Sequence, residues 1–77
     1  MTFKLLDTVV LTRDLPAHSL KAGDLGTVVE LYSPEGLEVE FVTASGQTGA
    51  LVTVKVRDVR QVADTDLVTV RSLVRSA

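Results

Sequence analysis

The segment Leu37–Val42 alternates apolar and acidic residues with a period of two. Three apolar and two acidic side chains take alternate positions: Leu37, Val39 and Phe41 against Glu38 and Glu40. Successive side chains of a β-strand point to opposite faces, so this pattern predicts a strand with one buried face and one carboxylate-bearing face. A slip of one residue would bury both glutamates, and the pairing of this strand is therefore strongly specified.

The other apolar runs are short, rich in β-branched residues and separated by turn residues, which is typical of strands. They predict strands over residues 5–11, 27–32 and 49–54, one tight helical turn over 55–59 and a short closing strand over 60–62. In the second run, Val29 and Leu31 are expected on one face. The run 49–54 leaves open whether its core face carries Ala50, Val52 and Val54 or Leu51. Five short strands with brief connections predict an all-β, five-stranded barrel, because closure removes exposed sheet edges.

Residues 14–24 form the longest predicted connection. Pro16 lacks the N–H that a central strand needs and disfavours helix at the residue before it. Leu15 and Leu20 give the connection two apolar anchors, so we expect it to fold back over the core. Gly23 and Gly26 favour a turn with positive φ, and Gly26 also allows a close approach of backbone at the start of a bent strand.

The C-terminal residues 63–77 have a different pattern and form a short extension, outside a barrel that we expect over residues 1–62. Asp64 or Asp66 can cap a helix, and Leu67, Val70 and Val74 would share one helical face. The β-branched sequence Val68–Val70 disfavours a helix, since such side chains lose rotamer freedom there. Helix, added strand and a loosely attached tail therefore remain the alternatives for this extension.

Composition excludes several kinds of site. The chain has 77 residues, no cysteine and one histidine, which excludes disulfides, thiol catalysis, and cysteine-based or histidine-rich metal sites. No apolar run approaches the roughly 18 residues of a membrane span, so we expect a cytoplasmic protein with no membrane partner. The sequence predicts no metal and no cofactor.

Residues suited to catalysis lack the partners that catalysis needs. His18 has Asp14 and Ser19 nearby in sequence, but no spacing rule joins these three into a triad, and a histidine that stabilises the long connection is the favoured interpretation. Glycosidases hold two carboxylates on opposite sides of a substrate cleft. A barrel of this size has too little surface to form the walls of such a cleft. We therefore predict that the protein is not an enzyme.

The distribution of charge is uneven, although the net charge is only −2. Residues 22–54 contain five acidic residues and no lysine or arginine. The hairpin formed by the predicted strands 27–32 and 37–42 is therefore acidic. It suits a cationic protein partner, through Glu30, Tyr32, Glu38 and Glu40, and an ordinary solubilising face explains the same charges equally well. The alternative is nucleic-acid binding through the basic residues Lys55, Arg57 and Arg60. We consider nucleic acid the weaker choice, because the acidic hairpin would repel a phosphate backbone and aromatic stacking residues are scarce.

Several segments together resemble a family of small, uncharacterised bacterial proteins whose domain has no known function. The resemblance covers about residues 4 to 62 and rests on Lys4-Leu5-Leu6-Asp7, Leu11-Thr12, Asp14-Leu15-Pro16, Gly23-Asp24-Leu25-Gly26-Thr27-Val28-Val29-Glu30 and Glu38-Val39-Glu40-Phe41. Some members are encoded beside toxin-like proteins, so the resemblance implies an antitoxin-like or immunity role.

The proline-histidine connection followed by Gly-Asp-x-Gly-x-Val is more distantly similar to SH3-like barrels of the nitrile hydratase β-subunit and of KOW modules. The first likeness implies a protein partner and the second implies contact with RNA or the ribosome. Residues 63–77 lie outside the family pattern, where they can serve a homodimer contact. The sequence thus predicts an SH3-like barrel that binds a protein partner, with an RNA- or ribosome-associated module as the alternative.

Overall fold

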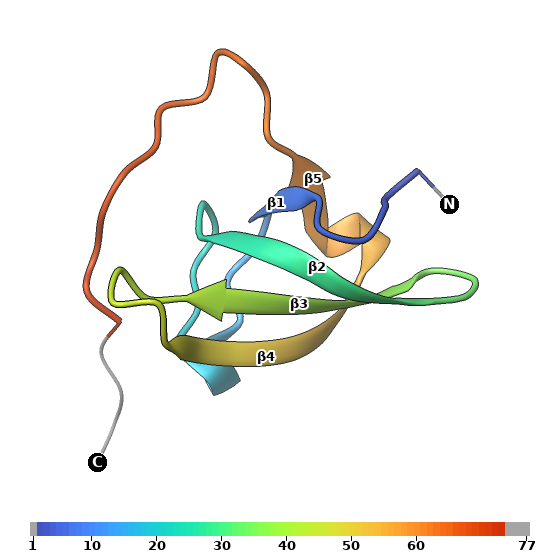
Figure 1. Ribbon diagram of the computed structural model, residues 1–77, viewed down its shortest axis with the longest axis horizontal. Helices are drawn as coiled ribbons and strands as arrows, with labels where there is room; N and C mark the ends of the chain where they lie inside the picture. The colour runs from blue at the N-terminus through green and yellow to red at the C-terminus, as the bar shows by residue number, and fades with distance from the viewer. Residues whose placement is uncertain (1, 74–77) are drawn as a thin grey trace.

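The long strand β2 (Leu25–Tyr32) organises the sheet in the computed structural model, which describes residues 2–73. One end of β2 pairs with β1 (Thr8–Leu11), and the rest pairs with β3 (Gly36–Val42). β4 (Thr48–Lys55) continues the sheet beyond β3, and the short β5 (Val59–Gln61) pairs with β1. All neighbours are antiparallel, in the order β4-β3-β2-β1-β5 (Figure 1). The predicted all-β class with five strands is confirmed.

Two 3₁₀ turns complete the fold. η1 (Pro16–His18) lies in the long connection from β1 to β2, and η2 (Val56–Asp58) joins β4 directly to β5. Since β4 and β5 are the two outermost strands of the sheet, this brief link makes the sheet curl into a small barrel-like body. The tight helical turn predicted over residues 55–59 is confirmed as η2, and the closing strand begins at Val59, one residue earlier than predicted.

All five strands contribute to one core. The predicted inward face of β3 is buried, as Leu37, Val39 and Phe41 are 0%, 0% and 5% exposed. β4 turns Val52 and Val54 inward and leaves Leu51 exposed, which resolves the alternative left open by its sequence. The remaining core residues come from the other strands and the connections: Phe3, Val9, Leu11, Leu20, Val28 and Val59.

The alternation predicted for β2 is wrong at Val29. A β-bulge shifts the register between Val28 and Glu30, so that Val28 pairs with Val39 while Glu30 pairs with Glu38. The extra residue turns Val28 and Leu31 toward the core and leaves Val29 exposed. Bulges bend a strand and increase its twist, which suits a strand that must pair with β1 at one end and β3 at the other.

The connection between β1 and β2 folds onto the core as predicted. Leu15 and Leu20 form an isolated bridge, and Leu20 is buried in the core. Gly23 has a φ of +96°. At Gly26, a Cβ would overlap Val39 Cγ1 and lie 2.9 Å from Phe41 Cε1, so only glycine fits without rearrangement.

The C-terminal extension is neither a helix nor an added strand over residues 63–73, and its remaining residues 74–77, including Val74, lie outside the described residues. Figure 1 shows this segment leaving β5, arching away from the sheet and returning beside the turn between β3 and β4. Asp66 does not cap a helix, because its carboxylate closes a turn by accepting the N–H of Ala63 at 2.7 Å. The β-branched residues disfavour a helix, and no sheet edge in the described part of the chain pairs with this segment to make it a strand.

Candidate functional site

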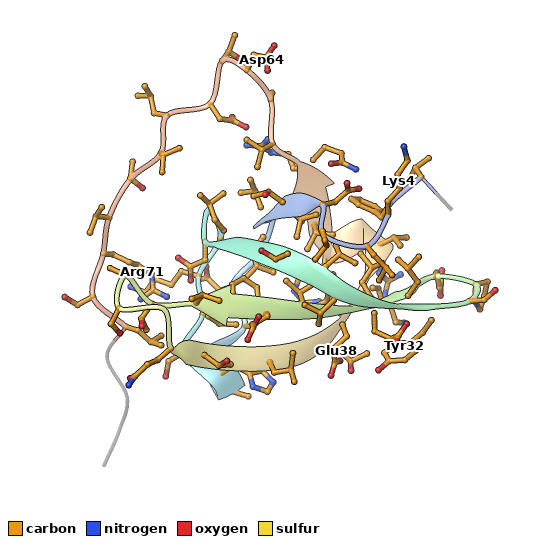
Figure 2. All side chains as sticks on the ribbon, viewed as in Figure 1. Lys4, Tyr32, Glu38, Asp64 and Arg71 are labelled. Carbon is orange, nitrogen blue, oxygen red and sulfur yellow. The ribbon has the colours of Figure 1, made fainter. Side chains whose placement is uncertain are left out.

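The outer face of β2, β3 and β4 brings the predicted acidic residues together. Glu30 lies opposite Glu38 in the β2–β3 pair, and Glu40, two positions along β3, shares the same face. Tyr32 pairs with Gly36 at the end of this face, and its side chain is 43% exposed. Figure 2 shows Glu38 and Tyr32 on the same region of the sheet. We call Glu30, Tyr32, Glu38 and Glu40 the acidic face.

Threonines on β4 orient two of these carboxylates. Thr53 Oγ1 donates to Glu38 Oε1 at 2.5 Å, and Thr48 Oγ1 donates to Glu40 Oε2 at 2.5 Å. Neither threonine carries charge, so these hydrogen bonds position the carboxylates without neutralising them. The acidic face therefore presents three carboxylates, two of which are oriented by hydrogen bonds from β4.

Exposed apolar side chains border the carboxylates. Leu51 lies directly opposite Glu40 and is 55% exposed, and Val29 beside Glu30 is exposed as well. Lys55 pairs with Gly36 and places one cation at the Tyr32 end of the face. Apolar area beside oriented charge is the composition expected where a protein surface meets a partner.

The three basic residues of the nucleic-acid alternative lie on three successive elements, and one of them is paired with an aspartate. Lys55 ends β4, Arg57 lies in η2, and Arg60 lies in β5. Arg60 donates two hydrogen bonds to Asp66, at 2.8 and 3.0 Å. This pairing raises the pKa of Arg60 and lowers the pKa of Asp66, chiefly through the hydrogen bond between their side chains. The Asp66 carboxylate offsets part of the positive charge that Arg60 would present to a phosphate.

His18 lies at the end of η1 with an exposed side chain. Its backbone N–H donates to the Leu15 carbonyl at 3.0 Å, so the residue helps to close the turn in the long connection. Among residues 2–73, no group of three histidine, cysteine, aspartate or glutamate side chains is arranged to hold a metal ion. No helical segment in the same range is long and apolar enough to cross a bilayer.

The structure also shows a contact that the sequence did not reveal, between Asp24 and Arg71. Arg71 Nε donates to Asp24 Oδ1 at 2.8 Å, and a terminal nitrogen of the same guanidinium donates to Oδ2 at 2.5 Å. The hydrogen bond from Arg71 is the main reason why the pKa of Asp24 lies below its usual value, while partial burial acts in the opposite direction. The two residues are far apart in sequence, so no local spacing could have linked them.

One part of this contact does have a sequence signal. Asp7, Asp24 and Asp58 each accept the backbone N–H of a lysine three residues earlier, and the spacing Lys-x-x-Asp therefore occurs at three turns. The spacing predicts the turn that orients Asp24, because short acidic side chains readily accept nearby backbone N–H groups. The spacing does not predict that Arg71 pairs with the Asp24 carboxylate.

The comparison with known protein families agrees with this architecture. Residues 5–61 match a family described as a domain of unknown function, DUF4926. The chain belongs to the DUF4926 family. The match spans all five strands of this DUF4926 domain and ends at the last residue of β5. The predicted resemblance to a domain of unknown function, over about residues 4 to 62, is confirmed for residues 5–61. Neither the curated proteins nor the solved structures include a match to the chain.

Proposed function

We propose that the protein is a non-enzymatic binding module whose acidic face contacts a cationic protein partner. The observation that supports this most directly is the register of Glu30, Glu38 and Glu40, which places three carboxylates on one exposed face beside Leu51. Such a face attracts a basic surface over a distance and offers apolar area once contact is made.

The partner we propose is a toxin-like protein encoded beside this chain, which gives the module an antitoxin-like or immunity role. The family resemblance supports this choice of partner. We also propose that the body is an SH3-like barrel, supported by the strand order and by the 3₁₀ turn between β4 and β5. A cytoplasmic location belongs to the same proposal, in keeping with a chain that has no cysteine.

The test is complex formation between the purified protein and the product of the adjacent gene at micromolar concentration. We expect the double substitution Glu38→Gln and Glu40→Gln to slow association about tenfold at low ionic strength, with a smaller effect at high salt. Glu35→Gln is the matched control, since Glu35 is an exposed glutamate in the turn between β2 and β3.

Two outcomes would contradict the proposal. One is the absence of a complex with the wild-type chain, and the other is an equal effect of Glu35→Gln. Salt-dependent retention on RNA that is lost when Lys55, Arg57 and Arg60 are neutralised would favour the nucleic-acid alternative instead.

A further inference from the structure

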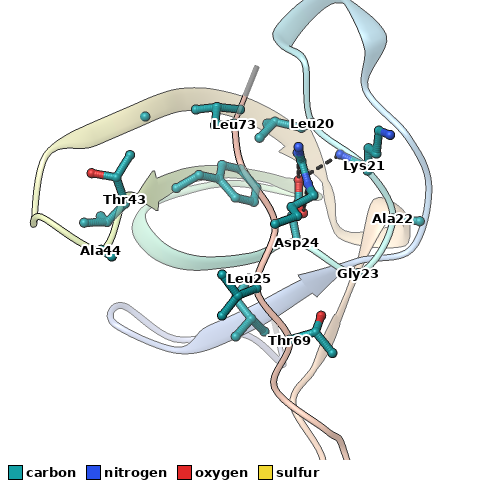
Figure 3. A pocket seen from close by; sticks show the side chains of 15 residues that line it. Leu20, Lys21, Ala22, Gly23, Asp24, Leu25, Thr43, Ala44, Thr69 and Leu73 are labelled. Carbon is teal, nitrogen blue, oxygen red and sulfur yellow. Dashed lines mark hydrogen bonds and ion pairs between the residues drawn. The ribbon is translucent and has the colours of Figure 1, made fainter. Parts of the chain in front are cut away.

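A groove of about 440 Å³ lies between the barrel and the C-terminal segment. The barrel side is formed by residues 20–25 and by the end of β3 with the turn that follows it, and the other side by Thr69, Val70, Arg71 and Leu73. Figure 3 looks into this groove, with Leu20 and Leu73 on its upper side and Leu25 and Thr69 on its lower side. The C-terminal segment therefore passes over the groove without filling it.

The first anchor of the segment is the guanidinium of Arg71. Besides its two hydrogen bonds to Asp24, it donates to the Ser19 carbonyl at 2.9 Å. The Asp24 carboxylate is held in place by the backbone N–H of Lys21 at 2.8 Å, and the charge of Asp14 adds to the negative potential around the guanidinium. Bidentate pairing with an oriented carboxylate is a geometry that selects arginine over lysine.

The second anchor is Leu73, two residues later. It packs against the core beside Gly49, where a Cβ would come within 2.9 Å of Leu73 Cδ2. Leu20 and Phe41 form the buried floor of the groove next to this position. Only Ser72 separates Arg71 from Leu73, so one short stretch of the segment reaches both anchors.

The rest of the segment is loosely held. In the described part of the chain, no hydrogen bond joins residues 67–70 to the remainder of the molecule. Leu67 and Val70 are 91% and 98% exposed, so these apolar side chains are not packed against the barrel. A tether of this length supplies an effective concentration on the order of millimolar, which keeps a weakly bound segment in place.

We propose that this groove is a docking site for an extended partner segment that carries an arginine two residues before a leucine, and that Arg71 and Leu73 occupy it as a displaceable intramolecular ligand. The open volume beneath the segment allows a partner with larger side chains to fill the site better than the chain's own residues do. This site differs from the acidic face and does not depend on it.

The test measures binding of a blocked peptide with the sequence of residues 66–73 to full-length chains by amide NMR shifts. The wild-type chain is compared with the double variant Arg71→Ala/Leu73→Ala, whose groove is vacated. We expect the vacated chain to bind the peptide about tenfold more tightly than wild type, because the tethered competitor is gone. The shifts should map to Leu20, Phe41 and Gly49.

Control variants show whether the peptide binds in this groove or elsewhere on the protein. Arg60→Ala removes another arginine–aspartate pair and should leave peptide binding at the wild-type level. Asp24→Asn in the vacated chain, and a peptide with alanine in place of arginine, should each weaken binding at least tenfold. Should the double variant fail to fold, Arg71→Ala alone removes the first anchor, and this variant should still bind the peptide more tightly than wild type.

Three results would overturn the proposal. The first is a vacated chain that binds no more tightly than wild type. The second is binding that is insensitive to Asp24→Asn. The third is a wild-type dimer that Arg71→Ala dissociates, because the groove would then belong to the segment of a second copy. Glu38→Gln/Glu40→Gln should not alter peptide binding, so failure here and failure of the acidic face are distinguishable.

Discussion

Gly26→Ala is expected to destabilise the fold by about 1–3 kcal/mol, through overpacking alone. The new methyl group would overlap Val39 Cγ1 and would lie 2.9 Å from Phe41 Cε1. Both side chains are buried in the core, at 0% and 5% exposed, so neither can swing into solvent. A domain of this size has about 4–12 kcal/mol of total stability, which makes such a loss readily measurable.

A double-mutant cycle tests this cause directly. Val39→Ala by itself removes two buried methyl groups and should cost about 2 kcal/mol. In the double variant, Val39→Ala removes the methyl group that clashes most closely with the new Ala side chain at position 26. The new methyl group then fills part of the cavity that Val39→Ala leaves. The pair should therefore be about 1–2 kcal/mol less destabilised than the sum of the single variants. Some of the cost remains, because the contact with Phe41 persists.

Urea unfolding of the four proteins, followed by far-ultraviolet circular dichroism, gives the required free energies. Val54→Ala is the matched control, since Val54 is a core valine of β4 and the nearest neighbours of the Cβ position of Gly26 belong to Val39 and Phe41 instead. Its combination with Gly26→Ala should be additive within about 0.5 kcal/mol. A neutral Gly26→Ala, or additivity in the Val39 cycle, would refute a steric cause.

Two further predictions concern aspartates. Asp58→Ala should cost about 1–2 kcal/mol, because the buried carboxylate accepts the Lys55 N–H at 3.2 Å and pairs with Arg13. Arg13→Ala should cost less than about 1 kcal/mol, since that arginine is mostly exposed, and equal losses in chemical denaturation would contradict this assignment. The pKa of Asp24 is lower in the folded protein, so its pairing with Arg71 stabilises the fold above about pH 4 and is lost as the pH falls through the folded pKa. Arg71→Ala should reduce the fall in melting temperature between about pH 5 and about pH 2, and an unchanged fall would show that the pair is not coupled to folding.

The alternation over residues 37–42 was enough to predict the strand, its buried face and its outward carboxylates. A period of two in one segment is a local property of the sequence. Because burying a carboxylate is costly, the glutamates of such a strand face outward in any sheet. The packing of Leu15 and Leu20 against the core was likewise predictable, because apolar side chains in a long connection favour burial. The close approach of backbone at Gly26 was predictable because glycine has no side chain.

The bulge at Val29 and the path of the C-terminal segment depended on the tertiary structure. A run of valines fits either face of a strand, and only the need to pair with both β1 and β3 decides where the extra residue goes. Residues 62–73 follow neither helical nor strand geometry, because Arg71 and Leu73 meet anchors on distant parts of the chain. Such contacts have no local pattern in the sequence, since they exist only after the sheet has brought Asp24 and Gly49 to the same end of the barrel.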